Sequence, residues 1–208
     1  AMGLLVTLGI VYGDIGTSPL YVMKAITGAT PLVTADYILG AVSCIIWTLT
    51  FQTTLKYVVL ALRADNRGEG GILALYALVR RRGRMWLYLL AIIGASTLVA
   101  DGIITPSITV LSAIEGLRAY EPSTPVIPIA IAILTVLFFI QQFGTHAIGK
   151  LFGPLMFVWF TMIGILGLAH IGNYLPILKA FNPWYAIHLL ATSPEWFLIL
   201  GAVFLCTT

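Results

Sequence analysis

Long apolar stretches separated by short polar segments dominate the hydropathy pattern of this chain. Several stretches reach the roughly 20 residues that an α-helix needs to cross the apolar core of a bilayer, which is about 30 Å thick. Continuous apolar runs of this length indicate membrane-spanning helices rather than strands. The pattern predicts five complete spans and the start of a sixth, at about residues 3–28, 38–62, 85–117, 125–142, 151–172 and from 194 onward.

The amino-acid composition agrees with this interpretation. Of the 208 residues, 60% are hydrophobic and only 9% are charged, and the mean hydropathy is +1.01, whereas soluble domains carry about 25% charged residues. We therefore predict an all-α integral membrane protein in contact with lipid, without a soluble domain. A net charge of +3 is too small to indicate nucleic-acid binding, and the three histidines have no spacing typical of a metal site.

The basic residues are concentrated in one loop, and this predicts the topology. Six of the eleven lysine and arginine residues lie in the segment 63–84, between the second and third spans. The positive-inside rule assigns this loop to the cytoplasm, so the N-terminus is expected in the cytoplasm and the aromatic-rich segment 173–193 outside. Within the inner loop, residues 72–79 are too short to span and predict a helical turn or two at the membrane surface.

The first span is interrupted near its middle by polar and helix-breaking residues. The apolar segments 4–11 and 20–26 are each too short to cross a membrane, and between them lies Tyr12-Gly-Asp-Ile-Gly-Thr-Ser-Pro19. Ser18 predicts an N-cap followed by proline at the first helical position. Non-helical backbone at membrane depth occurs only where it is buried in protein or lines a water-filled cavity. Free carbonyls together with the carboxylate of Asp14 suit a hard cation; the alternative is a glycine-rich kink in which Asp14 only satisfies exposed amides.

The third span carries a second acidic residue near its centre, Asp101, and Pro106 predicts a kink close to it. At helical spacing, one face of this helix collects hydroxyl and carboxyl side chains: Thr97, Asp101, Thr105, Ser112 and Glu115. Such a face is expected to point into the helix bundle. A buried carboxylate with hydroxyls one turn away suits a dehydrated monovalent cation or a proton relay. Asp14 and Asp101 are therefore predicted to form one site from two helices.

Two further acidic residues have open alternatives. Glu115 lies fourteen residues beyond Asp101, about 21 Å along the helix axis. It is either a carboxylate on the ion entry path or in the coupling of transport, or an interfacial residue whose charge Arg118 balances. Glu69 in the basic inner loop is either a cytoplasmic gate or, with Asp65, a structural partner of the arginines of the same loop, Arg63 and Arg67.

The same residues carry a family resemblance. The segment Gly9-Ile-Val-Tyr-Gly-Asp-Ile-Gly-Thr-Ser-Pro-Leu-Tyr21 resembles the signature of the KUP/HAK/KT potassium permease family. Two more segments resemble family motifs in the family's order, Arg63-Ala-Asp-Asn-Arg-Gly-Glu-Gly-Gly71 and Asp101-Gly-Ile-Ile-Thr-Pro-Ser-Ile-Thr-Val-Leu-Ser-Ala-Ile-Glu-Gly-Leu117. The likeness continues through Phe143-Gly-Thr, Gly149-Lys-Leu-Phe-Gly-Pro154, Gly172-Asn-Tyr and Phe181-Asn-Pro183. It therefore covers almost the whole chain.

The resemblance implies a LeuT-like fold of the amino acid–polyamine–organocation superfamily, built from a five-plus-five inverted repeat. Residues 1–193 would then form the first repeat, and residues 194–208 the start of the sixth helix. The implied potassium ligands are Asp14, Tyr21, Asp101, Thr105 and Thr208. The resemblance further implies potassium uptake with proton symport by alternating access, in a multi-pass protein of the cell membrane that is a homodimer at full length. It implies no cofactor and no metal other than potassium, and Glu115 matches an acidic family position implicated in transport.

In the family, the sixth span continues after the position of Thr208 with Gly-Ala-Glu, whose glutamate is a leading candidate for proton coupling. We expect that residues 1–208 alone do not transport. One alternative is a permease of the same fold for amino acids or organic cations, which would favour an apolar pocket with few carboxylates. A remote alternative, an enzyme, is an intramembrane aspartyl protease. Against it, Leu98-Val-Ala100 precedes Asp101 in place of glycine-x-glycine, and Asp14 lies in a broken helix.

Overall fold

The computed structural model of the chain describes residues 7–9, 11, 13, 15–80, 85–142 and 145–207, and every regular element in these ranges is helical. The prediction of an all-α membrane protein is confirmed at this level. The α-helices are α2 (Ser18–Gly28), α3 (Ala35–Leu49), α4 (Ile72–Arg80), α5 (Met85–Leu117), α6 (Val126–Gln141), α7 (Thr145–Ile171), α8 (Pro183–Thr192) and α9 (Trp196–Phe204). The π-helix η1 (Thr50–Leu60) and the 3-10 helix η2 (Ala61–Arg63) extend α3, and a second 3-10 helix, η3 (Leu175–Phe181), precedes α8.

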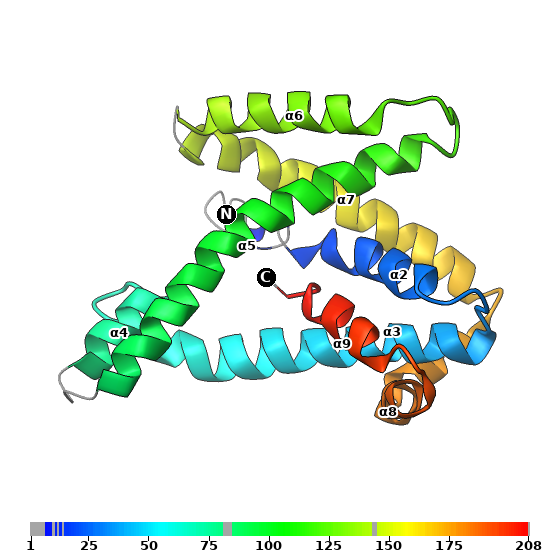
Figure 1. The fold of residues 1–208 in the computed structure, drawn as a ribbon, viewed down its shortest axis with the longest axis horizontal. Helices are drawn as coiled ribbons and strands as arrows, with labels where there is room; N and C mark the ends of the chain where they lie inside the picture. The colour runs from blue at the N-terminus through cyan, green and yellow to red at the C-terminus, as the bar shows by residue number, and fades with distance from the viewer. Residues whose placement is uncertain are drawn as a thin grey trace.

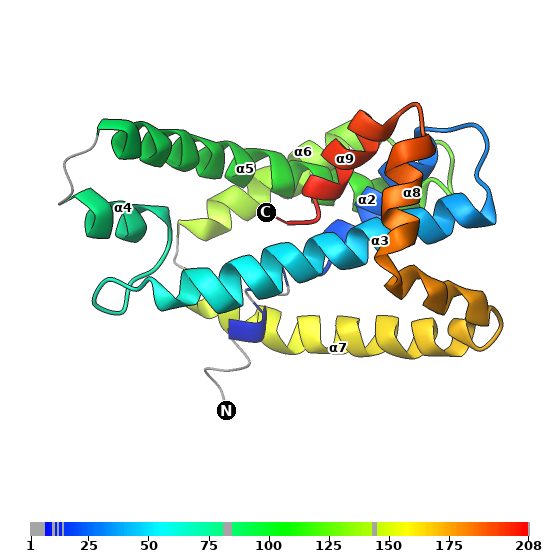
Figure 2. The same cartoon turned by 90° about the horizontal axis from the view of Figure 1, so that it is seen from below.

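Three described helical segments are long and apolar enough to cross a membrane, namely 35–63, 85–117 and 152–171, and α6 is a shorter apolar helix. The helix α5 has the same bounds as the predicted third span, whereas α7 begins before residue 151. The short helix α4 lies in the loop that is predicted to be cytoplasmic, where the sequence predicted one or two helical turns. In Figure 1, α5 crosses the molecule diagonally and α6 packs near the C-terminal part of α5. In Figure 2, α5 and α7 lie on opposite sides of α3.

The first span resumes as α2 after a turn at residues 16–17. The N-cap of α2 is Thr17, with φ −97° and ψ −24°, and its side chain makes no capping hydrogen bond. The prediction that Ser18 is the N-cap was wrong by one residue, because Ser18 is the first helical residue and its hydroxyl faces Tyr21 instead. Pro19 remains within the first turn, where a missing backbone N–H costs no helical hydrogen bond.

The predicted outer segment 173–193 is more helical than its composition indicated. It contains η3 and α8, and Asn182 begins α8 by accepting a hydrogen bond on its side-chain oxygen from the Trp184 amide at 3.0 Å. Pro183 follows at the first helical position. The segment is attached to α3, because Ser43 Oγ donates to the Asn182 carbonyl at 3.0 Å and Trp47 Nε1 donates to the Phe181 carbonyl at 3.1 Å.

Among the described residues, the largest core cluster lies where α2, α3, α8 and α9 meet, in the lower right of Figure 1. Val22 and Ile26 of α2 and Ile199 of α9 are fully buried there. The close approach of α3 to α8 depends on Gly40, because a Cβ at this position would lie 2.6 Å from Leu189 Cβ. No flexible side-chain end is available to give way at that distance.

A methyl group at position 40 is therefore expected to separate α3 from α8. We predict that Gly40→Ala in the full-length protein lowers the free energy of unfolding by about 1–3 kcal/mol, the usual cost of overpacking a core. The measurement is the thermal unfolding midpoint in detergent. The matched control is Gly28→Ala, because a Cβ there meets no atom within 4 Å. Equal midpoints for the two variants would contradict this account of the α3–α8 contact.

Candidate ion-binding site

The predicted acidic residue of the third span is joined to its neighbour one turn on. Thr105 Oγ1 donates to Asp101 Oδ1 at 2.8 Å, and both residues are half-buried on α5. Pro106 follows directly within the helix. Because proline has no N–H, the carbonyl of Gly102 loses its helical donor at this turn. The same turn of α5 thus presents a carboxylate, a hydroxyl and a backbone carbonyl, three oxygen ligands that suit a hard cation.

Contacts made further along α5 show which of its faces is directed towards α2. Ile108 packs against the core cluster of α2, α3, α8 and α9, and Glu115 forms an ion pair with Lys24 of α2. Residues seven apart lie two helical turns apart on nearly the same side of a helix. Asp101, Ile108 and Glu115 therefore share one stripe, and this stripe runs along the side of α5 that meets α2.

The predicted ligand Tyr21 is buried and connects α2 to the end of α9. Its hydroxyl donates to the Leu205 carbonyl at 3.2 Å and lies 3.1 Å from Ser18 Oγ. The two segments are 184 residues apart in the sequence. Figure 1 shows α9 running back along α2, so that its C-terminal end lies beside the start of α2.

The residues that follow α9 form tight turns, and the Leu205 carbonyl among them meets Tyr21. Leu205 is the C-cap, and the amides of Cys206 and Thr207 donate to carbonyls three residues earlier, at 3.0 and 3.2 Å. The C-terminal end of a helix carries a partial negative charge and stabilises a nearby cation. Two of the predicted ligands, Asp14 and Thr208, lie outside the described residues.

Glu115 does not depend on Arg118 for its counter-charge. Its carboxylate is paired with the ammonium group of Lys24, whereas the Arg118 amide donates to the Glu115 carbonyl at 3.2 Å. The positive charge that balances Glu115 is therefore on α2, and not on Arg118 as the sequence-based alternative had it. Helical spacing identified Arg118 because it is near in the sequence, and it cannot detect a partner on α2.

Glu69 belongs to a tight turn in the inner loop. Its amide and carbonyl pair with those of Asn66, at 3.2 and 2.8 Å, around Arg67 and Gly68, which have φ values of 58° and 85°. Asp65 Oδ2 accepts a hydrogen bond from the Gly68 amide at 2.9 Å. The expected ion pairs of these carboxylates with the loop arginines are absent, since Lys24–Glu115 is the one ion pair among the described residues.

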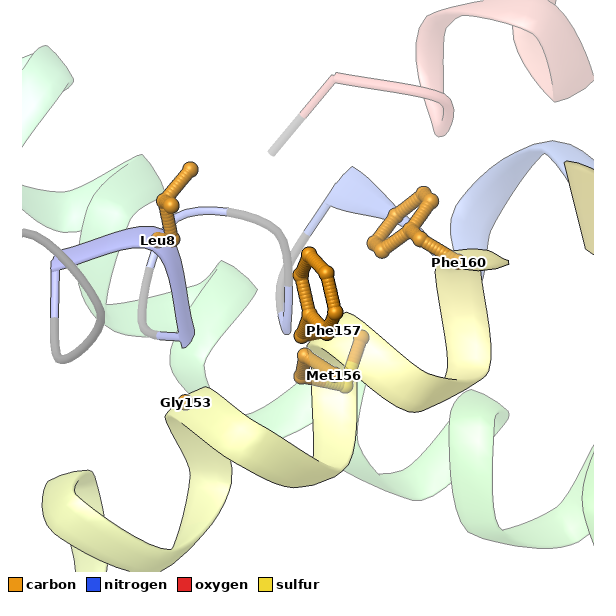
Figure 3. Close-up of a pocket in the computed structure, with 5 residues that line it drawn as sticks. All are labelled: Leu8, Gly153, Met156, Phe157 and Phe160. Atoms are coloured by element: carbon orange, nitrogen blue, oxygen red, sulfur yellow. The ribbon is translucent and has the colours of Figure 1, made fainter. Parts of the chain in front are cut away.

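A separate apolar cavity of about 240 Å³ lies between the segment around Leu8 and α7, lined also by Gly153, Met156, Phe157 and Phe160 (Figure 3). The backbones come close here, because a Cβ on Gly9 would lie 2.5 Å from the Gly153 amide nitrogen. The described lining residues are all apolar or glycine. The described residues also contain no group of three histidine, cysteine or acidic side chains that would hold a transition metal.

Comparison with known proteins supplies a family context. The sequence model of a family described as "K+ potassium transporter integral membrane domain" matches residues 1–208. The chain is similar to the probable potassium transport system protein Kup of Flavobacterium johnsoniae, with 57% identity over 209 residues that cover 99% of this chain and 32% of that protein. For the corresponding protein of Flavobacterium psychrophilum the identity is 59% over 206 residues, covering 99% and 31%. For that of Latilactobacillus sakei it is 53% over 220 residues, covering 99% and 32%.

The chain spans about a third of the length of the curated relatives it matches. No solved structure matches the chain.

The link between Tyr21 and α9 predicts a measurable loss of stability. In the full-length protein, Tyr21→Phe removes a buried donor to the Leu205 carbonyl, and we expect the free energy of unfolding to fall by about 1 kcal/mol. The measurement is the thermal unfolding midpoint in detergent. Tyr120→Phe is the matched control, since Tyr120 is 93% exposed. A midpoint for Tyr21→Phe as high as that of the control would argue against this link.

Proposed function

Because the chain belongs to the K+ potassium transporter family, we propose that it forms the ion-binding part of a permease that takes up potassium across the cell membrane. Membership of a transporter family rules against the alternative of an intramembrane aspartyl protease. The KUP/HAK/KT resemblance seen in the sequence is confirmed by the same comparisons. The transported ion, its ligands and the mechanism are the content of the proposal.

The observation that carries the proposal is the Thr105–Asp101 hydrogen bond on α5. By helical periodicity Asp101 shares a stripe with Ile108, which packs on the core cluster, and Glu115, which pairs with Lys24 of α2. A half-buried carboxylate with no counter-ion partner among the described residues is costly in a membrane and is usually functional. A potassium ion would neutralise Asp101 while exchanging its hydration water for protein oxygens. We propose that Asp14, Tyr21 and Thr208 complete the ligand set, with Asp14 and Tyr21 from the first span and Thr208 from the sixth.

A LeuT-like arrangement is part of the proposal. Residues 1–193 would be the first repeat and residues 194–208 the start of the sixth helix, with the N-terminus in the cytoplasm and a homodimeric full-length protein. The turn before α2 supports a first span interrupted at membrane depth, and the end of α9 beside α2 supports a site between discontinuous helices. An amino acid or organic cation permease is expected to have an apolar substrate pocket with few carboxylates, so the oxygen-rich turn of α5 supports an inorganic cation instead.

Loss of an oxygen ligand should weaken ion binding. In the full-length protein, we predict that Thr105→Val raises the KM for rubidium or potassium uptake about tenfold, since a hydrogen bond to a charged group is worth roughly 1.5–3 kcal/mol. Asp101→Asn should abolish uptake because it removes the charge that compensates the cation. Uptake is measured in potassium-starved cells that lack other potassium importers.

The matched controls lie on other helices. Thr135→Val removes a hydroxyl of α6 that bonds only a backbone carbonyl of its own helix, at 2.7 Å, and Asp36→Asn removes an acidic residue from the exposed first turn of α3. Both should retain uptake. The proposed site would be wrong if Thr105→Val resembled its control, or if Asp14→Asn left uptake unchanged.

We also propose that potassium uptake is coupled to proton influx, which a carboxylate site allows because a protonated and an ionised acid differ in affinity for a cation. Uptake into proteoliposomes of the full-length protein should rise severalfold when the outside is made more acidic than the inside. A protonophore should remove this stimulation at constant membrane potential. Rates that do not respond to the imposed pH gradient would contradict coupling while leaving the ion site intact.

A further inference from the structure

We propose that the ion pair of Lys24 and Glu115 is an electrostatic latch, in which the ammonium group of Lys24 is a tethered cation that an incoming potassium ion displaces from Glu115. The inference rests on the proposed function, because it requires that the protein carries a monovalent cation. It assigns a role in setting apparent affinity to Lys24, a residue outside the proposed ligand set.

The pair lies at one end of both helices that carry site residues. On α2, Lys24 is six residues beyond Ser18, about 9 Å along the axis, and on α5, Glu115 is about 21 Å beyond Asp101. The proposed topology assigns these ends to the outer side of the membrane. An ion that enters from outside along the facing sides of α2 and α5 therefore meets the pair before it reaches Asp101.

The ion pair links two different helices and is not a contact within one helix. The partners are 91 residues apart in the sequence, and the pair forms although Arg118 lies one turn from Glu115 on the same helix. Because α2 and α5 each contribute one charge, moving the outer ends of these helices apart breaks the pair. The ion pair is therefore formed when the outer ends of α2 and α5 are close together and broken when they are apart.

The exposure of the pair makes it reversible. The side chain of Lys24 is 59% exposed and that of Glu115 is 38% exposed. Ion pairs of this exposure are weak and are screened by salt, so they are suited to opening and closing. An ammonium group and a potassium ion carry the same single charge and have similar radii, and the two therefore compete for one carboxylate.

The test is the concentration dependence of rubidium uptake by the full-length protein in proteoliposomes, normalised to the amount of inserted protein. Lys24→Gln removes the competing cation and should lower KM at least twofold. Glu115→Gln removes the carboxylate that attracts the ion and should raise KM at least fivefold, and the double variant should have the KM of Glu115→Gln. Lys179→Gln removes the same charge from η3 on the same proposed side of the membrane, without touching the pair, and should leave KM unchanged.

A purely structural ion pair gives a different pattern. In that case Lys24→Gln and Glu115→Gln both shift KM in one direction, or both lower only the maximal rate, and either result would overturn the latch. Lys24→Arg keeps the charge and the packing, and its forked guanidinium binds a carboxylate more firmly, so its KM should rise; an unchanged or lower KM counts against the proposal. If the unmodified protein takes up no rubidium, the proposed function itself fails, whereas normal uptake with an unaltered KM for Lys24→Gln defeats only the latch.

Discussion

The burial of α2 among α3, α8 and α9 is the interaction on which the rest of the described site depends. A helix of eleven residues is too short to be stable by itself, so its position is set by packing. Val22 and Ile26 are fully buried in the cluster, and within a membrane such helices are held together by close van der Waals packing. The interrupted backbone before α2 is held in place because the helix after it is fixed on its apolar side.

Two polar side chains of α2 also reach neighbouring elements. Tyr21 reaches the end of α9, and Lys24 reaches Glu115 of α5. One short helix therefore sets the relation between the two other elements that bring oxygen ligands to the proposed site. The outer segment contributes indirectly, because Ser43 and Trp47 bind it to α3 and α8 packs beside α9.

The long helices α5 and α7 are less buried than α2. Large apolar side chains along α5 and α7 are exposed in this chain, among them Leu98, Ile103, Val158 and Leu168. Exposed apolar surface of this kind suits contact with lipid or with other parts of a longer membrane protein. Against this apolar background, the Asp101–Thr105 pair stands out on α5 as the polar feature placed where the helix approaches the core.

Sequence alone predicted apolar helical segments, a basic loop at residues 63–84 and a hydroxyl of Thr105 one turn from Asp101, because each follows from the order of residues within one segment. Helical periodicity brings residues four apart into contact wherever the helix lies. Only the tertiary structure decided that Glu115 pairs with Lys24 rather than with Arg118, and that Tyr21 binds the Leu205 carbonyl.

The helices of the outer segment and the demand for glycine at position 40 also belong to the tertiary structure. These features join segments far apart in the chain, and no local periodicity encodes which helix faces will meet. They depend on how apolar faces pack, and a polar side chain finds its partner only after that packing has placed it. The sequence therefore predicted the chemistry of the proposed site, and the packing of α2 decided which of the described polar groups come together.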